Sequence, residues 1–112
     1  MPITLKQRPA VSAGAVEVIS IDLTPYLDPG ELVASLITPV EQTTSDLTLD
    51  SEKVSDEVLS ILDDDNVEVG HAVQFRVQGQ LAANSPYRIR ITPTTDSTPA
   101  RSPVFDILLQ VK

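Results

Sequence analysis

The feature that most constrains this chain is a strict alternation of apolar and polar residues in GHAVQFRVQGQLAANSPYRIRIT, which spans Gly70 to Thr92. Successive side chains of a β-strand point to opposite faces of the sheet, so this pattern predicts two strands that are each half buried and half hydrated. A turn-rich segment separates the two strands, which predicts a β-hairpin. The side chains expected to face the core are Val73, Phe75, Val77, Tyr87, Ile89 and Ile91.

Other short apolar segments, separated by turn residues, predict further strands. Alternation indicates strands within residues 15–23, 46–50 and 104–111. Residues 31–38 are apolar on both faces, which is typical of a central strand. Residues 92–103 are rich in Thr, Ser and Pro, and we expect them to form the tip of a hairpin.

Residues 54–62 fit two kinds of secondary structure. Their five apolar residues would share one face of a helix, for which Ser55 could be the N-cap. The alternation of Val58, Ser60 and Leu62 also fits a strand. We favour the strand because the segments on both sides also have strand patterns.

Length and composition set the fold class. A chain of 112 residues with nine prolines and four glycines forms one domain with many turns and without long helices. About seven short strands predict an all-β fold, an antiparallel β-sandwich, over residues 14–112. Residues 1–13 contain two prolines and no sustained period, and we expect them to form an extended N-terminal arm.

The charge and the absence of cysteine exclude several classes of function. A net charge of −8 argues against nucleic-acid partners and anionic membranes, which attract Lys and Arg. Without cysteine there are no disulfides, thiolate catalysts or zinc–thiolate sites. No apolar run reaches the roughly 20 residues of a membrane span. The apolar stretch after Lys6 and Arg8 is interrupted by Pro9 and Glu17, so no targeting signal is expected.

One acidic motif invites a calcium hypothesis, because Asp63, Asp65 and Asn66 could supply hard oxygen ligands. An EF-hand loop needs Gly at its sixth position and Glu at its twelfth. Counted from Asp63, these positions hold Glu68 and Gln74. We therefore expect a solvated acidic turn and no metal site.

His71 is the single histidine, so the chain has no second histidine for a metal site. No nucleophile motif lies near His71 in the sequence. The chain also lacks a glycine-rich phosphate loop. We expect no catalytic residues, no cofactor and no enzymatic activity.

The positive charges are the candidate contacts for partner proteins. Arg88 and Arg90 share the outer face of one predicted strand, with Arg76 on the strand expected beside it. These arginines either contact a partner or pair with local carboxylates. In the predicted arm, Ile3 and Leu5 would occupy an apolar groove of a neighbouring subunit, and Lys6 or Arg8 would meet its carboxylates.

The C-terminal half carries a family pattern. A V-x-F-x-V-x-G strand at residues 73–79 is followed by a Tyr-starting strand at 87–91, a loop with Thr94, Thr95 and Arg101, and an alternating strand at 105–111. Upstream, IDLTPYLDPGELVASLITP forms an acidic, turn-rich entry into a strand. Over residues 19–112 the chain resembles the fiber–tail adaptor family of small tailed-phage virion proteins. Leu23 stands where that family often has Trp, and Gln80 where it often has Gly.

The resemblance implies an immunoglobulin-like β-sandwich whose loops, edges and arm dock on a larger assembly. The implied function is a non-enzymatic structural component of the virion, either a neck or tail adaptor or a capsid decoration (cement) protein. Its partners would be capsid, neck or tail subunits and copies of itself. Arg101 joins Ile3, Leu5, Lys6, Arg8, Arg88 and Arg90 as an expected contact residue. Tyr87 would be the corner tyrosine of such domains, with its hydroxyl bonded to backbone.

Two other function classes are open to a β-sandwich. A secreted or cell-surface module for adhesion or carbohydrate binding is disfavoured by the absence of cysteine, of an expected leader and of tryptophan for stacking on sugars. A hydrolase would require a nucleophile and a base, and the sequence shows no such arrangement.

Overall fold

The computed structural model describes residues 3–61 and 64–112, with the backbone alone at residues 64 and 65. The fold is all-β, and the helical turns in the described chain are the two 3₁₀ turns η1 (Thr24–Tyr26) and η2 (Ala82–Asn84). The strands are β1 (Ile3–Thr4), β2 (Ala10–Val11), β3 (Glu17–Asp22), β4 (Val33–Leu36), β5 (Val40–Glu41), β6 (Thr48–Val54), β7 (Leu59–Ile61), β8 (Asp64–Val67), β9 (Ala72–Gln78), β10 (Tyr87–Ile91), β11 (Pro93–Thr95) and β12 (Phe105–Val111).

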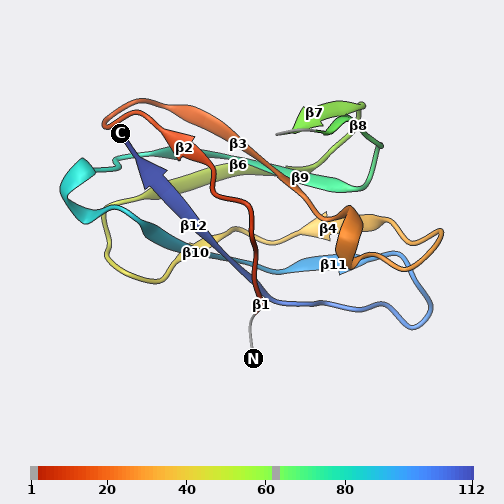
Figure 1. Ribbon diagram of the computed structural model, residues 1–112. Helices are drawn as coiled ribbons and strands as arrows, with labels where there is room; N and C mark the ends of the chain where they lie inside the picture. The colour runs from red at the N-terminus through yellow and green to blue at the C-terminus, as the bar shows by residue number, and fades with distance from the viewer. Residues whose placement is uncertain (1–2, 62–63) are drawn as a thin grey trace.

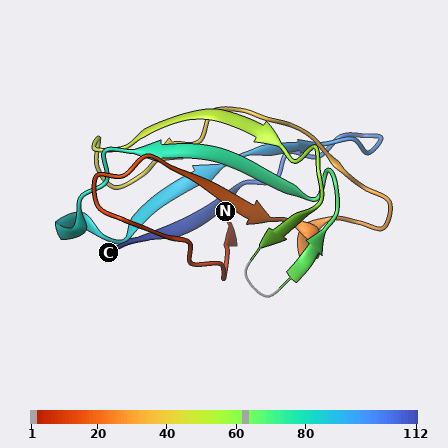
Figure 2. The same ribbon diagram turned by 90° about the horizontal axis from the view of Figure 1, so that it is seen from above.

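The strands form two main layers (Figure 1). In the upper layer, β9 lies between β3 and β6 and is antiparallel to both. In the lower layer, β10 lies between β12 and β5 and is antiparallel to both, while β1 and β2 pair in parallel with β12. The β11–β4 pair continues this layer, since β11 follows β10 and β4 precedes β5. Figure 2 shows β7 and β8 as a separate hairpin at one end.

The core lies between the two layers and confirms the alternation of the sequence. Phe75 of β9, Ile89 of β10 and Ile107 of β12 are all fully buried in one apolar cluster. Branched aliphatic residues supply most of this cluster, as expected for a chain with few aromatic residues. The other buried members are Leu5, Val11, Ile19, Ile21, Leu23, Val33, Val73, Val77, Tyr87, Ile91, Phe105 and Leu109.

The predicted hairpin between β9 and β10 is wrong. The two strands pair in different layers, and residues 79–86 carry the chain from one layer to the other. This connection is longer than the roughly 2–5 residues of a hairpin loop. Gly79 has φ +88°, and a Cβ at this position would collide with the carbonyl oxygen of Asp46. The turn therefore requires glycine.

Residues 31–38 do not form a central strand. β4 pairs only with β11 among the described strands, and it lies at the edge of its layer. Val33 is buried, whereas Ala34, Ser35 and Ile37 are exposed. By contrast, residues 92–103 do lie between two paired strands, because β10 and β12 are antiparallel, but residues 93–95 form β11 and pair with β4 instead of belonging to a hairpin tip.

The strand preference for residues 54–62 is confirmed only in part, since no helix forms in the described residues but residues 55–58, which include Val58, lie between two strands. β6 ends at Val54 and β7 spans Leu59–Ile61, while Leu62 lies outside the described residues. Ser55 does not cap a helix. Its buried hydroxyl accepts hydrogen bonds from the backbone N–H groups of Gly70 (3.1 Å) and Ala72 (3.3 Å), which ties the end of β6 to the start of β9.

The described part of the predicted arm, residues 3–13, packs on the domain. Leu5 donates its backbone N–H to Asp106 (2.8 Å), and Lys112 donates to Val11 (2.9 Å). The side chains of Leu5 and Val11 are 1% and 5% exposed in the core. The sequence pattern did not predict this packing, because only Leu5 and Val11 turn inward in the arm. They are six residues apart, with Pro9 between them.

The hydroxyl of Tyr87 links the start of β10 to backbone, as the resemblance implied. It accepts from the backbone N–H of Leu81 (2.9 Å), donates to Asp46 (2.9 Å) and lies 3.3 Å from the carbonyl oxygen of Leu81. The ring is fully buried, so the hydroxyl has no access to bulk water.

Replacing Tyr87 by phenylalanine should lower the free energy of unfolding by about 1–3 kcal/mol, because the partly buried N–H of Leu81 loses its acceptor and Asp46 loses a donor. Urea denaturation measures the change. Tyr26→Phe is the matched control, because the structure shows no hydrogen bond to the Tyr26 hydroxyl within the described residues. Equal effects of the two substitutions would contradict a special role for the Tyr87 hydroxyl.

Candidate protein interaction surface

Arg88 and Arg90 lie on the outer side of β10 and converge on one carboxylate of β12. Arg90 holds Asp106 through Nε (3.0 Å) and Nη2 (3.3 Å), and Arg88 reaches it through Nη1 (3.1 Å). The Asp106 side chain is only 5% exposed, whereas the two arginines are 38% and 39% exposed. The hydrogen bonds from Arg90 lower the pKa of Asp106 despite its desolvation, and those from Arg88 add to the effect.

This surface keeps an unbalanced positive charge, because two guanidinium groups face one carboxylate. Arg88 also contacts Thr4 of β1 through the same Nη1 atom (3.3 Å). Its Nε and Nη2 groups have no hydrogen-bond acceptor among the described residues. A guanidinium with free donors can bind an external carboxylate. We call the surface formed by Thr4, Arg88, Arg90 and Asp106 the arginine face.

Arg76 does not extend the arginine face. It lies on β9 in the other layer and forms a two-pronged pair with Asp50 of β6, at 2.7 and 2.9 Å. The predicted stripe of three arginines therefore contains two. Strand pairing explains the difference, since alternation places a side chain on a face but does not identify the neighbouring strand, and β9 and β10 belong to different layers.

Arg101 is occupied within the domain. Its Nε donates to Glu31 (3.1 Å), its Nη2 also contacts Glu31, and the same group reaches the carbonyl oxygen of Tyr26 (3.3 Å). The Glu31 side chain is 2% exposed, and its pair with Arg101 strongly lowers its pKa. Arg101 thus ties the loop before β12 to the turn that follows η1.

The arm residues divide into exposed and buried positions. Leu5 is in the core and cannot fill a groove on a neighbour, contrary to the expectation. Ile3 is 48% exposed and Lys6 is exposed. The Arg8 guanidinium contacts the carbonyl oxygens of Leu5 and Gln7. Ile3, Lys6 and Arg8 are exposed to solvent.

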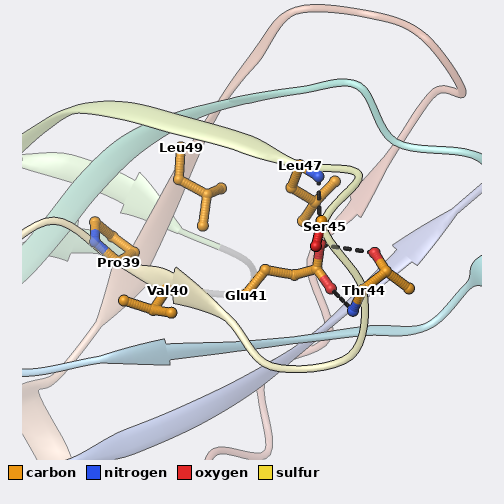
Figure 3. A pocket seen from close by; sticks show the side chains of 7 residues that line it. All are labelled: Pro39, Val40, Glu41, Thr44, Ser45, Leu47 and Leu49. Carbon is orange, nitrogen blue, oxygen red and sulfur yellow. Dashed lines mark hydrogen bonds between the residues drawn. The ribbon is translucent and has the colours of Figure 1, made fainter.

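A notch opens where the two layers part between β5 and β6 (Figure 3). It has a volume of about 350 Å³ and is lined by Pro39, Val40, Glu41, Thr44, Ser45, Leu47 and Leu49. Its apolar walls could receive a small apolar side chain.

The one carboxylate in the notch is not free to act as a base. Glu41 accepts hydrogen bonds from the hydroxyls of Thr43 and Thr44 (both 2.8 Å) and from the N–H of Leu47 (3.3 Å). Burial raises the pKa of Glu41, but the hydrogen bonds from Thr44 and its neighbours outweigh this and lower it. Glu41 is therefore ionised, and it stabilises the turn that follows β5.

The acidic motif and the histidine form no assembled site in the described chain. No group of three His, Cys, Asp or Glu side chains there is placed to hold a metal ion. Asp63, part of the calcium hypothesis, lies outside the described residues. His71 contacts the Thr24 hydroxyl (3.3 Å) and lies 3.9 Å from Glu68. No helix in the described part is long and apolar enough to cross a membrane.

Sequence reasoning missed the carboxylates that organise these surfaces. Three carboxylates accept hydrogen bonds from groups that are distant in the sequence or are brought close by a turn. They are Asp106, Glu31 and Glu41. For Asp106 a signal was present, because it is the one acidic residue within a strongly apolar strand. A charge inside such a strand predicts an opposite charge on a neighbouring strand.

Acidification should destabilise the domain. The folded-state pKa values of Glu31, Glu41, Asp46, Asp50 and Asp106 lie below their ordinary values of 4.5 for Glu and 3.8 for Asp. A lowered folded-state pKa contributes stability above the ordinary value, and this contribution is lost as the pH falls through the folded value. The melting temperature should therefore fall steadily below about pH 4, as measured by circular dichroism. A constant melting temperature down to about pH 2 would contradict these pairings.

Comparisons with protein-family models, with curated proteins and with solved structures find no match to this chain.

Proposed function

We propose that the domain has the immunoglobulin-like fold. The pairing of β3, β9 and β6 corresponds to strands B, E and D, and that of β5, β10 and β12 to strands C, F and G. The tyrosine that begins β10 bonds to backbone a few residues upstream, as the corner tyrosine of these domains does. In this scheme β1 and β2 form strand A, and the β7–β8 hairpin is an insertion before strand E.

We further propose that the chain is a non-enzymatic structural component of a bacteriophage virion that docks on neighbouring virion proteins. The observation that carries the proposal is the distribution of polar groups. Arg76 and Arg101 are each paired with a carboxylate of their own, whereas the arginine face sets two guanidinium groups against one carboxylate and keeps donors of Arg88 free for an outside carboxylate. The resemblance to fiber–tail adaptors supports the virion setting. A neck or tail adaptor and a capsid decoration protein fit equally well.

The carbohydrate-binding alternative gains no support from the aromatic residues. Sugar-binding sites present flat aromatic faces to solvent. Here Phe75, Tyr87 and Phe105 are buried, and Tyr26 packs against Phe105 with ring centres 5.0 Å apart. The sequence contains no other aromatic residue.

Quantitative mass spectrometry of purified particles tests the proposed role. The chain should copurify with particles after washing and gradient sedimentation. Copies comparable in number to the major capsid protein indicate decoration, whereas copies sufficient for a single ring indicate an adaptor. Absence from purified particles, with the chain abundant in the infected lysate, would overturn the virion proposal.

A further inference from the structure

The lower layer has a free edge at β1. This strand pairs with β12 on one side, and no other described strand pairs with it. Ile3 and Leu5 donate their backbone N–H groups to the carbonyl oxygens of Val104 (3.0 Å) and Asp106 (2.8 Å), so both turn their main-chain groups toward β12. Because this direction alternates along a strand, the N–H and C=O groups of Thr4 point away from β12. They have no hydrogen-bond partner within the described part of the chain.

A pocket of about 320 Å³ lies between the residues that follow β1 and the upper layer. Gln7 joins the two layers here, since its side-chain amide donates to the carbonyl oxygen of Asp22 and accepts from the N–H of Asp22, both at 3.1 Å. The hydroxyl of Tyr26 has no hydrogen-bond partner among the described residues. We call this pocket the arm pocket, and its lining residues are Leu5, Lys6, Gln7, Asp22, Pro25 and Tyr26.

Positive charge gathers at the β1 edge. Arg88 extends across β12 to the hydroxyl of Thr4 (3.3 Å), and its Nε and Nη2 groups are free. Lys6 is exposed and forms no ion pair in the described chain. The one carboxylate of the arm pocket, Asp22, already accepts hydrogen bonds from the N–H (2.9 Å) and the hydroxyl (2.6 Å) of Thr24. The β1 edge therefore favours an external carboxylate.

The opposite edge of the lower layer, β5, does not offer this combination. β5 borders the notch, which is lined by the carboxylate of Glu41 and by no basic residue. Arg88 and Arg90 both extend toward Asp106 of β12, and so away from β5. A carboxylate on a strand beside β5 would therefore lie near Glu41 and far from the free guanidinium donors.

We propose that β1 accepts an extended segment of a neighbouring protein as an additional strand, and that acidic and apolar residues alternate in this segment. The free main-chain groups of Thr4 bind the segment, as strand edges do in β-augmentation. Successive side chains of a strand point to opposite faces, so an apolar side chain enters the arm pocket while its acidic neighbours lie on the outer face with Arg88 and Lys6. The inference rests on the proposed docking role of the arginine face and names the chemistry of the docked segment.

Titration of the purified chain with a synthetic peptide, followed by nuclear magnetic resonance, tests the proposal. The probe is a short blocked peptide in which valine and glutamate alternate. Saturable shifts should appear at the backbone amides of residues 3–7 and of Tyr26, and binding should weaken as the ionic strength rises. The Thr4 amide should become protected from hydrogen exchange, because it gains an acceptor. Absence of saturable shifts at residues 3–7 would overturn the proposal.

A peptide of the same composition, with its glutamates grouped at one end, is the control for alternation. It should bind at least about threefold more weakly, because it cannot place valine and glutamate on opposite faces of one strand. Equal binding of the two peptides would contradict strand addition.

Two variants test the charges at the β1 edge. Lys6→Gln and Arg88→Gln should each raise the dissociation constant of the alternating peptide about threefold or more. In Arg88→Gln, Arg90 still holds Asp106. Arg76→Gln is the charge-matched control, because it removes a positive charge from the other layer and should leave the affinity unchanged. Thermal melting verifies that each variant is folded. Unchanged affinity in Lys6→Gln or in Arg88→Gln would overturn the proposal.

The titration also separates this proposal from its alternatives. Shifts at residues 3–7 that depend on protein concentration without any peptide would identify a second copy of the chain as the occupant and contradict the proposal. Because the titration uses the purified chain, failure of the peptide to bind overturns strand addition and leaves the virion role intact. Absence of the chain from purified particles overturns the virion role and leaves peptide binding intact.

Discussion

Replacing Phe75 by alanine should lower the free energy of unfolding by about 3–5 kcal/mol. Phe75 is fully buried on β9, the central strand of the upper layer, and its ring points at the lower layer. The substitution removes a large apolar side chain from water-free surroundings and leaves a cavity that a close-packed core fills only in part. Guanidinium denaturation followed by circular dichroism measures the change.

Val18→Ala is the matched control for Phe75. It truncates an apolar side chain on the neighbouring strand β3, but Val18 is 65% exposed on the outer face. Its effect should stay within about 0.5 kcal/mol. A loss at Phe75 as small as that at Val18 would show that the inner and outer faces of the upper layer are reversed.

Replacing Leu5 by alanine should cost about 2–5 kcal/mol, which is the second large effect. The prediction separates two views of residues 1–13. If the arm rests on a neighbouring subunit, truncation of Leu5 should not change the stability of the isolated domain. An arm that completes the core makes the isolated domain depend on it, as its 1% exposure indicates.

Ile3→Ala provides the comparison within the same segment. Ile3 is 48% exposed and lies two residues before Leu5, in the strand β1 that pairs with β12, so its truncation should change stability by less than about 0.5 kcal/mol. Denaturation of the two variants side by side reports the difference. If the Leu5→Ala variant is as stable as the wild type, the arm is a separate docking segment, as the sequence predicted.

The sequence predicted which faces of the strands are buried more reliably than it predicted which strands are neighbours. Alternation identified Phe75, Ile89 and Ile91 as core residues because a half-buried strand imposes a period of two. The same period carries no information on pairing, so two strands that follow each other in the chain were wrongly joined in a hairpin. The connection at Gly79 and the change of layer after it depend on tertiary contacts with Asp46.

The candidate surface was predicted only in part for the same reason. Arg88 and Arg90 were placed correctly on one face, because they share a strand. Their shared partner Asp106 depends on the register between β10 and β12, which the sequence pattern leaves open. Leu5 was assigned to a partner because two inward side chains, Leu5 and Val11, six residues apart with Pro9 between them, produce no detectable period.

Cryo-electron microscopy of intact particles tests the proposed virion role most directly. The expected result is density for this two-layered domain at a defined position on the particle, with Arg88 and Arg90 facing carboxylates of a neighbouring subunit. Particles whose density is fully accounted for by other proteins would contradict the role. A bound domain with the arginine face open to solvent in every copy would contradict the docking surface.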